Sequence, residues 1–345
     1  MMVIFQNKII YMPSMPPFSR SEKIEDYARL CGAVRWEERR IRAEDGVEIA
    51  LCVGSIPREN DDGRRKHVVV LYFQGNGSST PPRLPFLSAV LNRLHRQPAA
   101  ADYTIVALSY RGYWTSRGRP SQKGIERDAI AALRWVQDTY SGRNGRDVYV
   151  LWGQSIGAGV ATGLVAHHTQ NMQNARKLHG MILETPFLSI KSMLLAMYPQ
   201  RWLPYRYLWP FLRNWWDSED AVRRIGRASD TLAPVDVPAS ASSTCTDAAT
   251  ATPTLSDTSR TLGRSNGAEP GWAKTLPTLI ISATNDELVP PGQAAALEKL
   301  CRDVGMSAVQ RVDVAGALHN DATIKGEGQN AVVEFLGQVG ESAQE

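Results

Sequence analysis

Cysteine is scarce in this chain. The four cysteines among 345 residues, Cys31, Cys52, Cys245 and Cys301, lie far apart, and no two of them form a C-x-x-C pair. Their spacing argues against a zinc site and against a disulfide framework. We therefore expect an intracellular protein, either cytoplasmic or peripherally associated with a membrane, and not a secreted one.

Long apolar runs are also missing. Lys8 interrupts the apolar N-terminal segment MMVIFQNKIIYMPSMPPFSR, residues 1–20. No run approaches the roughly 18 residues of a membrane span, and none has the length of a signal-peptide core. We expect residues 1–45 to form an extension whose apolar side chains either pack on the main domain or touch a membrane surface.

Neither sign of charge dominates. The formal net charge is +4, and acidic residues interrupt the basic clusters RWEERRIR at 35–42 and DDGRRK at 61–66. Recognition of nucleic acids generally needs a basic stripe or a known binding motif, and the sequence shows neither. We expect no nucleic-acid partner and interpret both clusters as solvated charged loops.

Apolar, β-branched runs alternate with helical patterns along most of the chain. Near-continuous apolar strands separated by helices are typical of a mostly parallel sheet that is covered on both faces, so the predicted fold class is α/β. Strands are predicted at 47–53, 67–73, 103–110, 148–152, 180–184, 278–283 and 309–314, and helices at 85–96, 124–140, 157–168, 292–302 and 330–339.

Residues 226–276 break this alternation. The segment is rich in Ser, Thr and Ala and has almost no large apolar side chains. It cannot bury enough apolar surface to offset the entropy lost on ordering. We expect a disordered insertion, a linker or regulatory loop, which separates the core into residues 46–225 and 277–340.

The segment Met197–Trp216 is dense in tyrosine and tryptophan and contains three prolines. Because prolines at this density disfavour a long helix, short helices and turns are expected. Two interpretations stay open for this part of a predicted cap at 190–225. It is either an aromatic cap buried on the sheet edge, or a lid that lines a pocket for an apolar substrate or meets a membrane interface.

The stretch GQSIGAG at 153–159 places Ser155 between a predicted strand and a predicted helix. A serine on such a tight turn projects above the carboxyl edge of the sheet, and Gly153 and Gly157 allow the backbone and the helix to approach closely. The start of the helix supplies N–H groups where an oxyanion would form. We therefore predict that Ser155 is a nucleophile.

A serine nucleophile needs a base, and elimination selects His319. His67 opens a strand at the opposite edge of the sheet, whereas His167 and His168 end the helix that follows Ser155. His319 lies in VAGALHND, directly after the last predicted strand, where the base of a nucleophile-elbow hydrolase is expected.

The acid that orients the base is expected in the loop after the preceding strand. The stretch TLIISATNDELVPP offers Asp286 and, as the alternative, Glu287. Asp286 comes first and is followed by apolar residues that indicate a turn into the next helix, so we predict Asp286.

The oxyanion hole needs a second N–H from the loop after an early strand. That strand is followed by Gln74-Gly75-Asn76-Gly77, whose glycines allow N–H groups to turn inward. We assign the N–H groups of Ile156 and Asn76, with that of Gly75 as the alternative.

Taken together, these motifs make the chain resemble the α/β-hydrolases, specifically the Bem46-like branch, which is also labelled serine aminopeptidase-like. The motifs are QGNGSS, YRGYWTSRGRPS, GQSIGAG, SATNDELVPP and GALHND, and the resemblance covers about 5–225 and 277–336. It implies the α/β-hydrolase fold. Relatives also suggest long acyl chains as substrates, including the deacylation of lipidated proteins.

Three features depart from the pattern of these relatives. Gln74 stands where histidine is usual before Gly-Asn, and Trp114 replaces a glycine, which is expected to narrow or reshape the pocket. Relatives often carry a membrane-spanning helix ahead of a segment like FQNKIIYMP, and this chain starts at that segment, so anchoring by that route is not expected.

The sequence therefore predicts a serine hydrolase acting on an ester or thioester, of a small molecule or an acylated protein, with no metal or organic cofactor. Two alternatives stay open: a non-catalytic binding or scaffold protein with the same fold, and an acyltransferase with the same triad. A peptidase is disfavoured because no acidic pocket for an amino terminus is evident. An epoxide hydrolase is disfavoured because it would have aspartate in place of Ser155.

Overall fold

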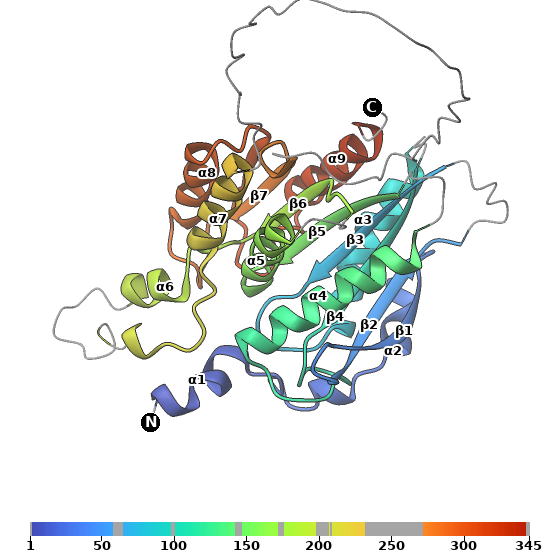
Figure 1. Ribbon diagram of the computed structural model, residues 1–345. Helices are drawn as coiled ribbons and strands as arrows, with labels where there is room; N and C mark the ends of the chain where they lie inside the picture. Colours follow the sequence, from blue (N-terminus) through green and yellow to red (C-terminus); the bar gives the residue numbers. More distant parts are fainter. Residues whose placement is uncertain are drawn as a thin grey trace, which may run out of the picture.

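The computed structural model describes residues 2–57, 65–97, 101–141, 147–171, 176–197, 207, 209–231 and 272–342. Within these ranges, eight strands form one sheet in the order β1-β2-β4-β3-β5-β6-β7-β8 (Figure 1). β2 runs antiparallel to both its neighbours, and all other pairs are parallel, which confirms the predicted α/β class. The strands are β1 (Arg35–Arg42), β2 (Glu48–Ser55), β3 (Lys66–Phe73), β4 (Ala101–Ser109), β5 (Asp147–Gln154), β6 (Gly180–Glu184), β7 (Thr278–Ala283) and β8 (Val309–Val314).

Helices cover both faces of this sheet (Figure 1). The buried side chains of α4, α5, α7 and α8 pack on one face, and those of α3 and α9 pack on the other. No helix in the described ranges has both the length and the apolar character needed to cross a bilayer. The helices are α1 (Met2–Tyr11), α2 (Ile24–Tyr27), α3 (Leu84–Arg96), α4 (Gln122–Thr139), α5 (Ile156–Gln170), α6 (Ile190–Met197), α7 (Ser218–Thr231), α8 (Gln293–Asp303) and α9 (Gly326–Ser342).

The central strand β3 shows why its sequence is apolar throughout. Val69, Leu71 and Phe73 pack under α4 and α5, whereas the alternating Val68 and Val70 pack under α3 and α9. Successive side chains of a strand point to opposite faces, so a strand covered on both sides needs apolar residues at every position.

The interpretation of RWEERRIR as a solvated loop is wrong, because these residues form β1. β1 pairs with β2 along its whole length and leaves most of its side chains exposed at the edge of the sheet. Backbone pairing and the partly buried side chains of Trp36 and Ile41, which pack against the core, hold this strand, and its exposed charges disfavour pairing of the open edge with other chains. The predicted extension at 1–45 therefore includes a strand of the core sheet. Most of DDGRRK lies outside the described residues, and its Lys66 begins β3.

The predicted insertion at 226–276 falls largely on residues 232–271, outside the described part of the chain. Its two ends are ordered. α7 continues to Thr231, and Trp272, Ala273 and Leu276 are buried in the core. The core thus resumes earlier than the composition indicates, because Trp272, Ala273 and Leu276 are buried although the segment before them is polar in composition.

The N-terminal segment packs on the core through Tyr11, which is fully buried. The Tyr11 hydroxyl donates a hydrogen bond to Asn214 Oδ1 at 2.8 Å and accepts one from Trp216 Nε1 at 3.0 Å. Met15 and Phe18, a few residues further on, are exposed. Tyr11 and Trp216 are thus packed on the core, which was one of the two interpretations for each of their segments. Tyr198, Trp202 and Tyr205 lie outside the described residues.

Candidate active site

Ser155 lies on the turn between β5 and α5 in a backbone conformation that non-glycine residues rarely adopt, with φ 54° and ψ −117°. Packing at the two flanking glycines leaves no room for a side chain. A Cβ on Gly157 would lie 2.1 Å from the Phe73 carbonyl oxygen, and one on Gly153 would lie 2.1 Å from the Gly157 carbonyl oxygen. The surrounding structure therefore holds the strained turn in place and presents Ser155 at the start of α5.

Asp286 and His319 lie on the loops that leave the adjacent strands β7 and β8. His319 Nδ1 lies 3.0 Å and 2.9 Å from the two carboxylate oxygens of Asp286. The N–H groups of Leu288 and Val289 donate to Asp286 Oδ1 at 2.9 Å and 2.7 Å. Burial raises the pKa of Asp286, but the hydrogen bonds from His319, Val289 and Leu288 outweigh it and hold that pKa below its ordinary value.

Glu287, the alternative acid, has a different role in the structure. Its Oε2 accepts the main-chain N–H of His319 at 3.0 Å, so it supports the loop and does not contact the ring. The hydrogen bonds of His319 in the described structure run to Asp286 and Glu287, and none joins its ring to the Ser155 hydroxyl. In ligand-free hydrolases this last contact is often long and tightens only in the substrate complex.

The loop after β3 borders Ser155, as the sequence predicts. A Cβ on Gly75 would lie 3.5 Å from Ser155 Cβ, so Gly75 is beside the serine. The next residue, Asn76, accepts the Gly77 N–H on its own Oδ1 at 2.7 Å and the Tyr113 hydroxyl at 3.4 Å. Both N–H groups assigned to an oxyanion hole, those of Asn76 and Ile156, thus belong to segments at this edge of the sheet.

Gln74 holds the start of this loop. Its side chain is fully buried, and its Oε1 accepts the Thr80 hydroxyl at 2.9 Å. The Tyr110 hydroxyl donates to the Gln74 carbonyl oxygen at 2.8 Å. These hydrogen bonds hold the loop without a histidine at position 74.

The N-terminal segment holds the same loop through hydrogen bonds to its main-chain carbonyl oxygens. The Gly77 N–H donates to the Tyr11 carbonyl oxygen at 3.3 Å, and the Ser78 N–H donates to the Met15 carbonyl oxygen at 2.5 Å. The Tyr113 hydroxyl also donates to the Tyr11 carbonyl oxygen. The sequence predicts only that this segment packs on the domain or touches a membrane. Its hydrogen bonds to the loop of Asn76 were missed, because main-chain carbonyl oxygens leave no motif in the sequence.

A cavity of about 520 Å³ is lined in part by Gln154 and Asn320, the chain neighbours of Ser155 and His319, whereas Ser155 and His319 themselves do not line it. Trp114 does not line it: that side chain is buried in the core, and its indole donates to the Glu22 carbonyl oxygen. The expectation that Trp114 narrows this pocket is therefore wrong. Nor does any described residue of Met197–Trp216 line it. The apolar wall is formed by Met12, Met15, Pro16, Phe86, Leu87 and Ile324, and polar groups come from Asn76, Arg83, Gln154, Glu184, Asn320 and Thr323.

Arg83, Glu184 and Thr323 are polar residues of this cavity that the sequence analysis missed. A signal existed for Glu184, because an ionisable side chain ends the buried run GMILE next to the strand of Ser155. Charged groups at the carboxyl ends of parallel strands commonly serve a site there. Arg83 and Thr323 lie in ordinary helical and turn sequence and become recognisable only in three dimensions.

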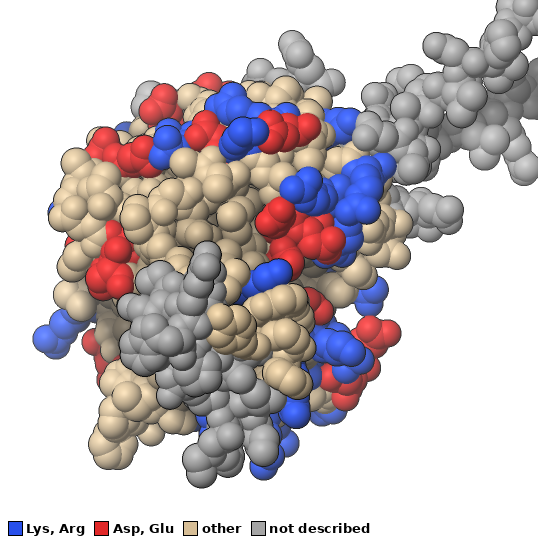
Figure 2. Space-filling view, turned by 90° about the vertical axis from the view of Figure 1, so that its left-hand side faces the viewer, with Lys and Arg blue, Asp and Glu red and all other residues tan. Residues whose placement is uncertain are grey.

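The side of the molecule that carries α1 and α6 presents a broad area of uncharged residues bordered by acidic and basic groups (Figure 2).

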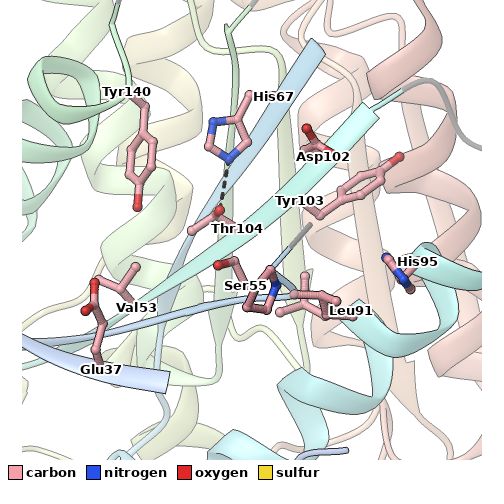
Figure 3. A pocket seen from close by; sticks show the side chains of 12 residues that line it. Glu37, Val53, Ser55, His67, Leu91, His95, Asp102, Tyr103, Thr104 and Tyr140 are labelled. Carbon is pink, nitrogen blue, oxygen red and sulfur yellow. Dashed lines mark hydrogen bonds between the residues drawn. The ribbon is translucent and has the colours of Figure 1, made fainter. Parts of the chain in front are cut away.

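A second cavity, of about 280 Å³, lies at the opposite edge of the sheet, where β3 begins (Figure 3). There His67 Nε2 is 2.9 Å from the Thr104 hydroxyl, and Asp102, Tyr103 and Tyr140 are among the other residues that line the cavity. No serine turn or helix N-terminus comparable to that at Ser155 faces this second cavity within the described ranges.

Comparison with known proteins agrees with this architecture. The family model described as alpha/beta hydrolase fold matches residues 68–322. The chain is 31% identical over 236 residues to the alpha/beta hydrolase domain-containing protein WAV2 of Arabidopsis thaliana, covering 65% of this chain and 68% of WAV2. It is 25% identical over 335 residues to protein bem46 of Schizosaccharomyces pombe, covering 97% of this chain and 86% of bem46.

A third relative is lysophosphatidylserine lipase ABHD12 of Mus musculus, 32% identical over 165 residues, which cover 44% of this chain and 38% of ABHD12. Among solved structures, an alpha-beta hydrolase from Vibrio vulnificus superposes with a TM-score of 0.60 at 16% identity, covering 96% of this chain and 92% of that one. The predicted resemblance to the Bem46-like branch is thereby confirmed. The chain belongs to the alpha/beta hydrolase fold family.

Proposed function

We propose that the protein is a serine hydrolase that cleaves ester or thioester bonds of apolar acyl substrates through an acyl-enzyme. The observation that carries the proposal is the contact of Asp286 with His319 Nδ1 at 2.9 Å and 3.0 Å, at the same edge of the sheet as the strained turn of Ser155. A histidine held by a buried carboxylate at the same edge as such a turn meets the geometric requirement for a base with its orienting acid.

In this proposal, Ser155 Oγ attacks the acyl carbonyl carbon while His319 Nε2 takes the hydroxyl proton. Asp286 fixes the tautomer of the ring and stabilises the imidazolium that forms. The N–H groups of Asn76 and Ile156, with Gly75 as the alternative to Asn76, hold the oxyanion. His319 then returns the proton to the leaving alcohol or thiol, and water repeats the sequence to release the acid.

The cavity supports an apolar substrate with a polar end. Its wall of Met12, Met15, Phe86 and Ile324 suits an acyl chain, and three of these side chains, Met15, Phe86 and Ile324, are more than 40% exposed at its rim. The relative ABHD12 is a lysophosphatidylserine lipase, which acts on an amphiphilic ester of this general kind.

A chain-length series of chromogenic esters and acyl thioesters tests the proposal. Wild type is compared with Ser155→Ala and His319→Ala, and each preparation is also treated with a serine-reactive phosphonate. Turnover and labelling that both variants lose support the hydrolase. A folded wild-type protein that neither turns over any substrate nor reacts with the phosphonate supports the scaffold alternative. Transfer of the acyl group to an added alcohol in preference to water supports the acyltransferase.

A further inference from the structure

Glu184 places a buried carboxylate beside both loops of the candidate site. It ends β6, and only 1% of the residue is exposed. Its main-chain oxygen accepts the N–H of Ser155 at 2.8 Å. Its carboxylate accepts hydrogen bonds from the Trp152 indole at 3.1 Å and the Gln154 amide at 3.3 Å, both on the strand that leads to Ser155.

The third hydrogen bond to this carboxylate comes from the loop of His319. Thr323, four residues after His319, donates its hydroxyl to Glu184 Oε1 at 2.7 Å, and both side chains are buried. Glu184 therefore contacts both loops. Its main-chain oxygen bonds the serine turn, and its carboxylate bonds strand β5 on one side and Thr323 of the histidine loop on the other. In the described structure, no direct hydrogen bond joins the Ser155 hydroxyl to the His319 ring, and the bond of Thr323 to Glu184 is an indirect connection between them.

The pKa of Glu184 lies above its ordinary value, although donors and positive charges surround its carboxylate. Burial raises its pKa, while the hydrogen bonds of Thr323 and Trp152 and the positive charges of Arg83 and His319 oppose that rise. Arg83 also donates to Gln154 Oε1 at 2.6 Å, which orients the amide toward the carboxylate. A buried carboxylate with several donors is costly to displace, because any displacement leaves charges and donors unpaired.

We propose that Glu184 is a positioning residue that, through the Thr323 hydroxyl, holds the His319 loop where the imidazole can reach the Ser155 hydroxyl. The inference rests on the proposed function. Glu184 does not touch the reacting atoms in this account. Its contribution is to the geometry of proton transfer, which affects kcat. Glu184 and Thr323 also line the cavity, but as polar groups outside its apolar wall.

The test removes the Thr323 hydroxyl with Thr323→Val and Thr323→Ala, restores it with Thr323→Ser, and uses Thr104→Val as the matched control. Thr104 is a buried threonine that bonds His67 at the opposite edge of the sheet, so its loss costs a similar hydrogen bond without touching the site. We measure kcat, KM, the rate of phosphonate labelling of Ser155 and the melting temperature.

Because misplacement of a catalytic group by about 1 Å can cost on the order of 100-fold in rate, we expect kcat and the labelling rate of both Thr323→Val and Thr323→Ala to fall by about 10- to 100-fold. KM is expected to stay within about threefold and Thr323→Ser to recover most of the rate, while Thr104→Val keeps the wild-type rate at a comparable melting temperature. The proposal is overturned if kcat is unchanged in folded Thr323→Val and Thr323→Ala, or if Thr104→Val loses as much. A wild-type protein with no turnover and no labelling would instead count against the proposed function itself.

Discussion

His319 and Asp286 face each other across the ends of two adjacent parallel strands, with Nδ1 within 3.0 Å of both carboxylate oxygens. The bond is almost fully shielded from water, since the two side chains are 4% and 8% exposed. Asp286 is itself fixed by two N–H groups of its own loop, so its orientation does not depend on the histidine. Such a prearranged carboxylate can hold one tautomer of the imidazole throughout a reaction cycle.

Asp286 and its neighbour Glu287 provide a matched pair of variants. We expect Asp286→Asn to lower kcat by roughly 10³- to 10⁴-fold, because the amide favours the wrong tautomer of His319. Glu287→Gln keeps an oxygen that can accept the His319 N–H and is expected to retain activity within about tenfold. Steady-state kinetics on the best ester checks both. Equal losses in the two variants would show that the acid is misassigned.

The lowered pKa of Asp286 makes a prediction about stability. A carboxyl group whose folded-state pKa is depressed stabilises the fold above its unfolded-state pKa, and this contribution is lost as the pH falls through the folded-state pKa. We therefore expect the difference in free energy of unfolding between wild type and Asp286→Asn to shrink as the pH is lowered from about 7 to about 3. Urea unfolding across this range measures it. A difference that grows toward acid pH would contradict the assignment of a depressed pKa.

Two glycines of α5, Gly157 and Gly163, are expected to change the stability of the protein in opposite directions when each is replaced by alanine. A Cβ on Gly157 would collide with backbone atoms of Phe73 and Gln74, whereas Gly163 has nothing within 4 Å of the position of its Cβ. We expect Gly163→Ala to stabilise the protein by about 1 kcal/mol through helix propensity. Gly157→Ala is expected to destabilise it by at least about 2 kcal/mol through forced backbone shifts. Thermal and urea unfolding compare the two, and a Gly157→Ala protein as stable as wild type would refute the close approach.

A buried ion pair supports the loop that follows β4. The Arg111 guanidinium contacts Asp128 at 2.8 Å and Asp45 at 2.7 Å, and its side chain is 7% exposed. Loss of one partner of a buried pair leaves an uncompensated charge, so we expect Arg111→Met to cost about 3–5 kcal/mol in free energy of unfolding. In contrast, Arg39→Met removes an exposed pair with Glu37 and should cost less than about 1 kcal/mol. Similar costs for the two variants would argue against the buried network.

The sequence could predict Ser155, Asp286 and His319 as candidates because each follows a predicted strand in a fixed order along the chain. Position relative to such a strand is local information, and it places these loops at one edge of a parallel sheet. The contact of Asp286 rather than Glu287 with the ring likewise agrees with the local turn that the apolar residues after Asp286 indicate.

What the sequence could not predict depends on contacts between distant segments. β1 is charged and exposed, so no apolar periodicity marks it as a strand. Tyr11 and Met15 hold the loop of Asn76 through carbonyl oxygens, which every residue type possesses. Thr323 joins Glu184 across 139 positions of sequence, and no local pattern distinguishes that threonine from an ordinary turn residue.

The measurement that tests the account most directly is active-site labelling of the full chain with a serine-reactive phosphonate, followed by peptide mass mapping. We predict a single stoichiometric adduct on Ser155. We also predict that Ser155→Ala abolishes the adduct, that His319→Ala slows its formation, and that ester hydrolysis falls in parallel. A folded wild-type protein that stays unlabelled, or whose adduct and esterase activity persist in Ser155→Ala, would contradict the central claim that Ser155 is the nucleophile of a hydrolase.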